Sequence, residues 1–130
     1  MAIRSVALVE DERDVAAMYR LGLEMRGFAV AVTRDGPAFF ESLETFLPDV
    51  VVLDWDLPTL TGGQVLSRLR EDERTRRLPV LILSNMPRHD YAAQVMTRLG
   101  GLAWLEKMKT TPAELADKVT QVFGNQSPSN

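Results

Sequence analysis

Short apolar runs alternate along this chain with segments whose apolar residues recur at helical spacing. The clearest run is Val-Val-Val-Leu at residues 50–53, which is typical of a strand buried on both faces of a parallel sheet. Similar runs occupy residues 6–9, 80–83 and 102–105, and a shorter apolar segment at residues 28–32 predicts an outer strand. The pattern therefore predicts five strands in one sheet.

The segments between these runs predict helices. Apolar residues within 15–23 and within 115–123 recur every three to four residues, which places them on one face of a helix. Before the second stripe, Thr111 and Glu114 have the spacing of a capping box, and Pro112 suits the first helical turn. The other helical segments are expected at residues 36–47, 62–73 and 89–99. Five strands alternating with five helices indicate a doubly wound α/β fold.

Length and composition fit a single cytoplasmic domain. Of the 130 residues, 1–124 are predicted to form this domain and 125–130 a flexible polar tail. The chain has no cysteine, which rules out disulfides and thiolate metal sites. The net charge of −3 and the absence of a membrane-length apolar run predict neither direct nucleic-acid binding nor a membrane partner. The mixed-charge stretch 70–77 is expected on a solvated helix end.

Polar residues follow four of the predicted strands. Glu10 and Asp11 come after the first strand, Asp54 after the third, Ser84 after the fourth and Lys107 after the fifth. In open parallel sheets, ligands bind at the edge where the strands end. We therefore expect three carboxylates, a hydroxyl and an ammonium to form one site.

The clustered acids predict a magnesium site. Two unit charges about 4 Å apart near a protein surface repel by roughly 4 kcal/mol, so three such carboxylates must be protonated, spread apart or occupied by a cation. Oxygen ligands without histidine or cysteine favour Mg²⁺ over zinc, and Mg²⁺ retains open positions for phosphate oxygens. Lys107 and Ser84 could then neutralise a phosphoryl group, and Asp54 could attack it to form an acyl phosphate.

Taken together, these motifs resemble the receiver domain of two-component response regulators, over about residues 5–123. Each motif is weak by itself, but all of them occur in the family's order at fitting spacing. The motifs that carry the resemblance are the acidic pair Glu10-Asp11, Asp54 with Leu57-Pro58 and Gly62 after it, Ser84 and Lys107.

The resemblance implies a flavodoxin-like fold with five helices around a five-stranded parallel sheet of order 2-1-3-4-5. It implies that Asp54 accepts a phosphoryl group from a histidine kinase or phosphotransfer protein. The domain would catalyse its own phosphorylation and dephosphorylation and would not be a conventional enzyme. It also implies that Glu10, through water, together with Asp11, Asp54 and the backbone carbonyl of Asp56, would hold the Mg²⁺.

The same resemblance implies which residues would take part in a conformational switch. Ser84 and Lys107 would contact the phosphoryl oxygens, and movement of Ser84 would let the Trp104 ring turn inward. The surface of the fourth helix, fifth strand and fifth helix would then change and act on a downstream protein target, which the sequence does not identify. Phosphorylation-dependent homodimerisation is left open, as is membership of a longer protein.

Three positions depart from the family pattern. The residue after the lysine is usually proline with a cis bond, but Met108 predicts a trans bond, since cis costs roughly 3 kcal/mol before other residues. Lys109 is a weaker substitute for Lys107. Asn85 replaces a smaller residue and is expected to narrow access to the phosphoryl group. The Asp56 side chain is expected to point to solvent.

Several alternatives remain. The Asp54-Trp55-Asp56 motif is also similar to the first motif of haloacid dehalogenase-type phosphatases, with Asp56 as general acid. An inactive receiver relative could act as a docking scaffold. Taken singly, Asp11 and Ser84 could be helix caps, and the lone histidine, His89, is expected in a solvated loop.

Overall fold

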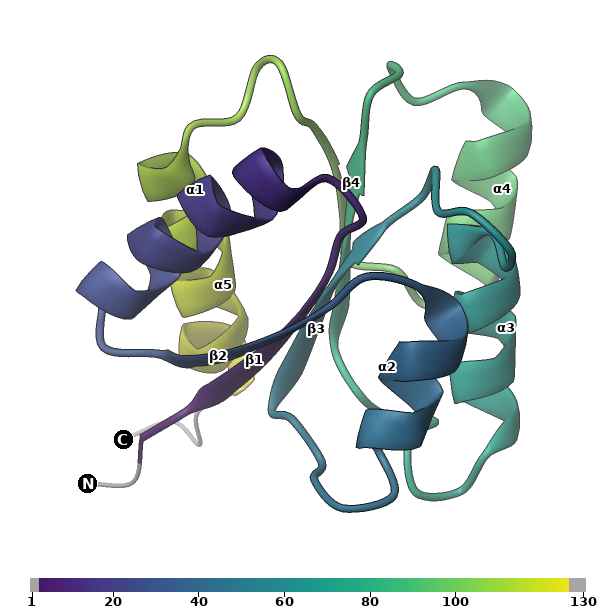
Figure 1. Cartoon of the computed structure of the whole chain (residues 1–130). Helices are drawn as coiled ribbons and strands as arrows, with labels where there is room; N and C mark the ends of the chain where they lie inside the picture. The colour runs from purple at the N-terminus through teal and green to yellow at the C-terminus, as the bar shows by residue number, and fades with distance from the viewer. Residues whose placement is uncertain (1–2, 127–130) are drawn as a thin grey trace.

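The computed structural model describes residues 3–126, which form one parallel sheet between two layers of helices (Figure 1). The sheet order is β2-β1-β3-β4-β5, so the predicted order 2-1-3-4-5 and the flavodoxin-like fold are confirmed. The elements in chain order are β1 (Ser5–Val9), α1 (Arg13–Met25), β2 (Ala29–Thr33), α2 (Gly36–Ser42), β3 (Val50–Asp54), α3 (Gly62–Glu71), β4 (Val80–Ser84), α4 (Asp90–Arg98), β5 (Ala103–Glu106) and α5 (Pro112–Gln126).

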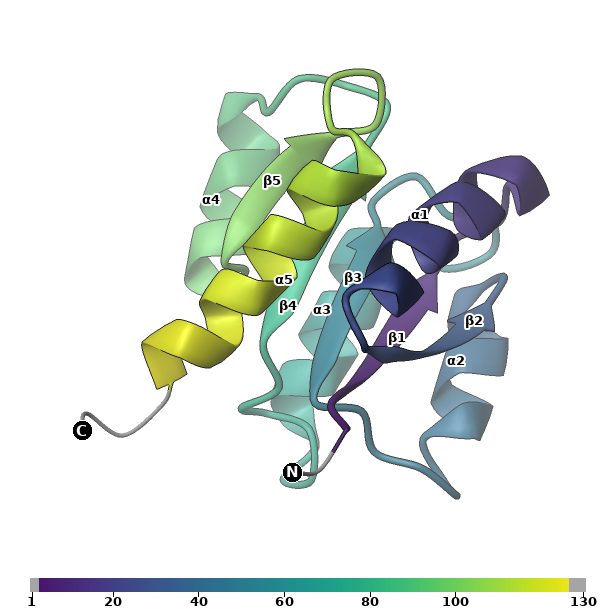
Figure 2. The same cartoon turned by 90° about the vertical axis from the view of Figure 1, so that its left-hand side faces the viewer.

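The helices cover both faces of the sheet. Helices α1 and α5 pack on one face, and α2, α3 and α4 pack on the other (Figures 1 and 2). All five residues of β3 and all five of β4 are buried, as expected for central strands of a parallel sheet. The two apolar cores therefore fix the position of the strand ends from both sides.

Capping boxes set the start of two helices. Thr111 Oγ1 accepts a hydrogen bond from Glu114 N, and Thr111 N donates to the Glu114 carboxylate, which confirms the predicted start of α5. The same reciprocal pair joins Thr61 and Gln64 at the start of α3. Each cap satisfies backbone donors that have no partner inside the helix.

The end of β3 lies directly against the start of α3. A Cβ added to Gly62 would stand 2.6 Å from the Cα of Trp55 and 2.7 Å from the carbonyl oxygen of Asp54. Only a residue without a side chain allows the two backbones to approach this closely. Gly62 therefore helps to hold the end of β3 in place.

Some element boundaries differ from the predictions. Helix α2 ends at Ser42 and not at Leu47, because the Ser42 hydroxyl donates to the Phe39 carbonyl and Pro48 follows soon after. Helix α5 extends to Gln126, two residues into the predicted tail, and residues 127–130 lie outside the described residues. Within the described part of the chain, no helix is both long and apolar enough to span a bilayer.

The stretch 70–77 is not a purely solvated helix end. The guanidinium of Arg70 donates to the carbonyl oxygens of Leu99 at 2.6 Å and Leu78 at 2.8 Å, and it reaches Gly100 at 3.4 Å. Burial lowers the pKa of Arg70 from its ordinary value. Arg70 therefore ties α3 to the end of α4 and to the segment before β4.

Candidate functional site

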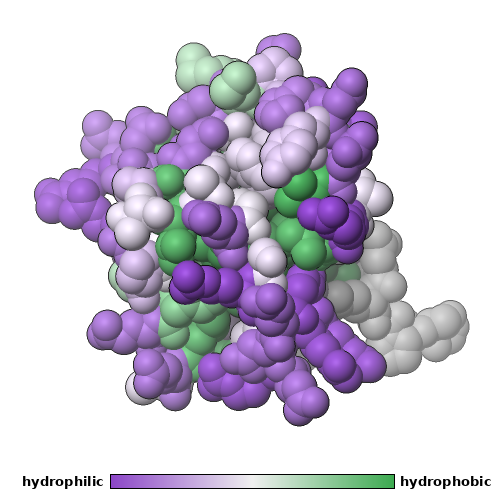
Figure 3. Space-filling model, turned by 90° about the vertical axis from the view of Figure 1, so that its right-hand side faces the viewer, coloured by the Kyte–Doolittle hydropathy of each residue, from purple (hydrophilic) through white to green (hydrophobic). Residues whose placement is uncertain are grey.

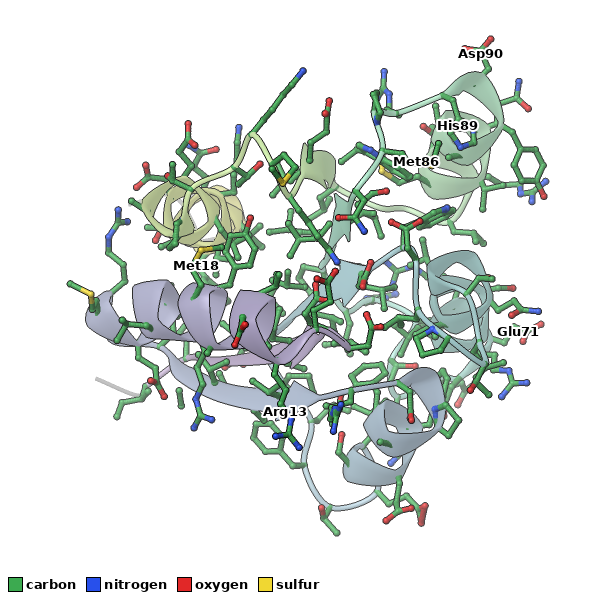
Figure 4. All side chains as sticks on the ribbon, turned by 45° about the horizontal axis from the view of Figure 1, so that its top comes forward. Arg13, Met18, Glu71, Met86, His89 and Asp90 are labelled. Carbon is green, nitrogen blue, oxygen red and sulfur yellow. The ribbon has the colours of Figure 1, made fainter. Side chains whose placement is uncertain are left out.

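The five residues expected to form one site meet at one edge of the sheet. Strands β1, β3, β4 and β5 run parallel, so their last residues lie on the same side. Glu10 and Asp11 follow β1, Asp54 ends β3, Ser84 ends β4 and Lys107 follows β5. Figure 4 looks toward this edge, with α1 on one side and α4 on the other. The spatial convergence expected from the sequence is therefore present.

Lys107 lies at the centre of the acidic cluster. Its Nζ is 3.0 Å from Asp54 Oδ2, 2.8 Å from Glu10 Oε1 and 3.1 Å from Glu10 Oε2. All three side chains are almost completely buried, whereas Glu12, 3.8 Å from the same ammonium, is exposed. The ammonium thus partly neutralises two buried carboxylates that would otherwise repel each other.

Burial changes the proton affinity of the site. Loss of solvent and the nearby Glu10 charge raise the pKa of Asp54 from 3.8 to about 7, although a 2.8 Å hydrogen bond from Asp56 N and the contact with Lys107 oppose the rise. For Lys107, burial lowers the pKa, but the bonds to Glu10 and Asp54 outweigh burial and raise it. The site is therefore rich in negative charge that is only partly compensated.

The carboxylates suit a small divalent cation. Oxygens of Glu10, Asp11 and Asp54 lie within 4.8 Å of one another. Glu10 Oε1 is buried and, despite its short distance to the Lys107 ammonium, accepts no hydrogen bond from the described residues. Three hard oxygen donors without nitrogen or sulfur fit Mg²⁺. The donor set thus agrees with the acidic metal pocket expected from the sequence.

Ser84 ends the strand beside Asp54 but makes no hydrogen bond to the Asp54 carboxylate. Its hydroxyl donates to Asp56 Oδ2 at 3.0 Å and accepts from Met86 N at 3.1 Å. The same Asp56 oxygen accepts from Asn85 N at 3.0 Å. Asp56 is exposed, as expected, but the expectation that its side chain simply points to solvent is incomplete, because its carboxylate binds the last residue of β4 and the residue after it.

Trp104 packs against the residue that follows Asp54. The Trp104 and Trp55 rings have centroids 5.2 Å apart and planes inclined by 58°. Trp104 Nε1 donates to the Met86 carbonyl at 3.0 Å, and the His89 ring approaches at 6.3 Å (Figure 4 labels Met86 and His89 beside α4). The indole thus connects β5 with the segment between β4 and α4.

The departure at Met108 and the alternative lysine, Lys109, have clear outcomes. Every peptide bond among the described residues is trans, which confirms the prediction for Lys107–Met108. Lys107 reaches the carboxylates without a cis bond. Lys109 instead lies 3.7 Å from Glu106 and is largely exposed, so it does not substitute for Lys107.

The helix-cap interpretations do not hold. Glu12, not Asp11, is the N-cap residue of α1, and it makes no side-chain cap bond. His89, not Ser84, is the N-cap of α4, where its Nδ1 accepts from Ala92 N at 3.4 Å. The prediction of a purely solvated His89 was therefore incomplete, because an imidazole acceptor is an unusual cap that the sequence did not reveal.

A groove beside the site was not apparent from the sequence. It measures about 690 Å³ and runs between α3 and α4, where its lining includes Trp55, Asp56, Gln64, Tyr91 and Arg98. Figure 3 shows the face that carries these helices, on which polar residues divide the apolar surface into separate patches. The Asp56 carboxylate therefore lies between this groove and the acidic cluster.

Comparison with known proteins agrees with this geometry. The family described as the response regulator receiver domain matches residues 6–120. The chain is 34% identical over 118 residues to the transcriptional regulatory protein PrrA of Mycobacterium tuberculosis, covering 90% of this chain and 47% of PrrA. It is 38% identical over 79 residues to the phosphate regulon transcriptional regulatory protein PhoB of Rhizobium meliloti, covering 61% of this chain and 35% of PhoB. The chain thus spans about a third to a half of these relatives.

Solved structures show the same fold. The chemotaxis response regulator CheY4 of Vibrio cholerae has a TM-score of 0.84 at 22% identity, covering 93% of this chain and 99% of CheY4. A putative response regulator from Chloroflexus aurantiacus has a TM-score of 0.84 at 27% identity, covering 95% of this chain and 99% of that one. The family match extends over most of the sequence and favours neither the phosphatase nor any unrelated class. The chain therefore belongs to the receiver domains of response regulators in two-component signalling.

Proposed function

We propose that Asp54 accepts a phosphoryl group from a histidine kinase or a phosphotransfer protein. The observation that carries this proposal is the contact of one Asp54 oxygen with Lys107 and of the other with Asp56 N, inside a cluster that includes Glu10 and Asp11. Both contacts fix the carboxylate at the end of a buried strand. The docking-scaffold alternative would keep this fold but would not use the acid chemically.

The reaction is a displacement at phosphorus. An oxygen of the Asp54 carboxylate forms the new O–P bond while the P–N bond of a phosphohistidine breaks and its electron pair returns to the imidazole nitrogen. Hydrolysis of the resulting acyl phosphate by water would return Asp54 to its carboxylate form and release inorganic phosphate. The residues around Asp54 hold the nucleophile in line and balance charge on the transferred group.

Mg²⁺ is the cation we assign to the site. Glu10, through water, together with Asp11, Asp54 and the backbone carbonyl of Asp56, would hold it. When bound, Mg²⁺ would supply positive charge to the phosphoryl oxygens and reduce repulsion among the carboxylates. Lys107 would give up part of its contact with Glu10 and Asp54 and contact a phosphoryl oxygen as a second cation.

The conformational switch would follow because the phosphoryl oxygens need hydrogen-bond donors. Ser84 would turn its hydroxyl toward the group, and Trp104 would respond because its indole is bonded to Met86 in the same segment. The surface formed by α4, β5 and α5 would then differ between the two states. Asn85 follows Ser84 directly and is exposed, and its side chain would limit access to the phosphoryl group.

The phosphodonor would approach the edge of the sheet beside α1. Met18, Leu21 and Met25 are exposed apolar residues on this helix, spaced so that they lie on neighbouring turns. Contact with a partner would bury them. The downstream target, the response of a longer protein and dimerisation on phosphorylation remain predictions.

Intact-mass analysis after treatment with acetyl phosphate and Mg²⁺ tests the proposal. The expected result is a gain of one phosphoryl group that depends on Mg²⁺ and is absent from Asp54→Asn. Lys109→Ala serves as a matched control for a lysine outside the site and should be phosphorylated like the wild type. No mass gain in the folded wild-type protein would favour the docking scaffold.

A further inference from the structure

The Ser84 hydroxyl has a partner other than the proposed phosphoacceptor. Ser84 Oγ donates its only proton to Asp56 Oδ2 at 3.0 Å, and it makes no hydrogen bond to Asp54, whose oxygens accept from Asp56 N and Lys107. Ser84 is completely buried, whereas Asp56 is exposed and could leave this position without disturbing the core. The Ser84 hydroxyl is thus bonded to the Asp56 carboxylate, which is free to move away.

The same carboxylate oxygen also fixes the backbone that follows. Asn85 N donates to Asp56 Oδ2 at 3.0 Å, so one oxygen accepts two hydrogen bonds from consecutive residues, the last residue of β4 and the first residue after it. The next residue, Met86, is held by Trp104 Nε1 through its carbonyl. Asp56 therefore holds the last residue of β4 and the first residue of the segment that follows, and Trp104 holds the second residue of that segment.

We propose that Asp56 is a positioning residue that holds Ser84 and Asn85 away from Asp54 and thereby opposes the phosphorylated state. This inference rests on the proposed phosphorylation of Asp54. A phosphoryl group on Asp54 needs the Ser84 proton, which a hydroxyl can donate only once. The group is also negatively charged, so it repels the Asp56 carboxylate that competes for this proton.

The competition predicts that removal of the Asp56 carboxylate favours binding of a phosphoryl mimic. With Mg²⁺ saturating, titration of beryllofluoride followed by tryptophan fluorescence should give roughly tenfold tighter binding for Asp56→Ala than for the wild type, the worth of one charge-assisted hydrogen bond at a partly exposed site. Glu12→Ala removes an equal charge near Lys107 without touching Ser84, and it should change the affinity much less. Equal or weaker binding by Asp56→Ala would overturn the inference.

A double-mutant cycle tests whether Asp56 acts through Ser84. In the Ser84→Ala background the hydroxyl is gone, so Asp56→Ala should lose most of its effect on beryllofluoride affinity. An undiminished effect would mean that Asp56 acts only through its charge, and the positioning role would be rejected. Asp56→Asn serves as a second variant that keeps the shape and an acceptor oxygen, and it should fall between the wild type and Asp56→Ala.

A measurement without metal or mimic separates this inference from the proposed function. Amide exchange of Asn85, followed by NMR in the metal-free protein, should become several-fold faster in Asp56→Ala because the amide loses its acceptor. If the exchange rate of the Asn85 amide did not change, the inference that Asp56 holds this segment would be wrong. Faster exchange together with a wild-type protein that fails to bind beryllofluoride would instead overturn the proposed function, and with it the competition with the phosphoryl group.

Discussion

Lys107 is the residue on which the charge balance of the site depends most. Its ammonium lies within 3.1 Å of oxygens from both Glu10 and Asp54, and these three side chains have almost no contact with solvent. Buried charges of this kind are tolerated because they are paired. The pairing with Lys107 therefore keeps the two carboxylates stable inside the fold.

Removing this ammonium should destabilise the fold. We predict that Lys107→Met lowers the free energy of unfolding at pH 8 by about 2–4 kcal/mol, since two buried carboxylates are left without their partner. Urea unfolding in metal-free buffer measures the loss. Lys109→Met is the matched control, because Lys109 is exposed, and it should remain close to the wild type. Equal stabilities of the two variants would contradict the central position of Lys107.

Asp54 should make stability depend on pH. Its pKa is raised to about 7, so between roughly pH 4 and 7 the folded protein retains a proton that the unfolded chain has lost, and stability falls as the pH rises. We predict that Asp54→Asn, which stays neutral, is about 1–3 kcal/mol more stable than the wild type at pH 8 without metal, and that the difference shrinks toward pH 5.

Urea unfolding across this pH range measures the difference. The exposed control Glu44→Gln should follow the wild type at every pH. If Asp54→Asn were instead less stable than the wild type at pH 8, the ionised carboxylate would be favoured in the fold, and the raised pKa would be wrong.

At the level of the elements, the join between β3 and α3 positions the acceptor. Gly62→Ala would place a Cβ against the backbone of Trp55 and Asp54, which cannot move aside as a flexible side chain can. We predict a loss of about 1–3 kcal/mol in urea unfolding and slower phosphorylation of Asp54. A Cβ on Gly63 would stand 3.3 Å from the Trp55 ring and 3.9 Å from Thr61 Oγ1, so only a side chain has to shift slightly and Gly63→Ala should cost much less than Gly62→Ala. A stable, fully active Gly62→Ala would show that this close approach is not required.

Arg70 joins α3 to two other segments through the carbonyl oxygens of those segments. We predict that Arg70→Ala lowers the free energy of unfolding by about 2 kcal/mol, because the carbonyls of Leu99 and Leu78 lose a charged donor. The exposed neighbour Arg77 provides the control, and Arg77→Ala should change stability by less than about 0.5 kcal/mol. If both variants had similar free energies of unfolding, the stretch 70–77 would be a solvated helix end, as expected from the sequence.

The elements themselves were largely predictable from the sequence. Residues 50–53 and 80–83 are apolar throughout because both strands are buried on both faces, so the strands and the meeting of their ends followed directly. The bond between Asp56 and Ser84 could not be foreseen, since it depends on the rotamer of an exposed side chain 28 residues away. The capping role of His89 and the reach of Arg70 depend in the same way on tertiary contacts.

For the whole molecule, the arrangement places the proposed phosphoacceptor and the proposed switch residues at the same edge. The Trp55 ring follows Asp54 directly and contacts Trp104, which is bonded to the segment that Asp56 also holds. A switch that moves from 1:99 to 99:1 requires about 5.5 kcal/mol of differential interaction. A phosphoryl group with Mg²⁺, Lys107 and the Ser84 hydroxyl could supply an amount of this order.

The two tryptophans offer a direct optical test of this coupling. We predict that beryllofluoride with Mg²⁺ changes the fluorescence of the wild-type protein and that Trp104→Phe removes most of the change, because the fluorescent indole bonded to Met86 is then absent. Trp55→Phe should retain a change from Trp104. If the whole fluorescence change came from Trp55, the change would report only events beside Asp54, and a movement of Trp104 on β5 would be contradicted.

The identity of the phosphorylated residue tests the central claim most directly. After treatment with acetyl phosphate and Mg²⁺, peptide mapping by mass spectrometry can distinguish the acids that lie together at this edge. The account predicts the phosphoryl group on Asp54, with none on Glu10, Asp11 or Asp56. A phosphoryl group on one of those other acids, or none on the folded protein, would contradict it.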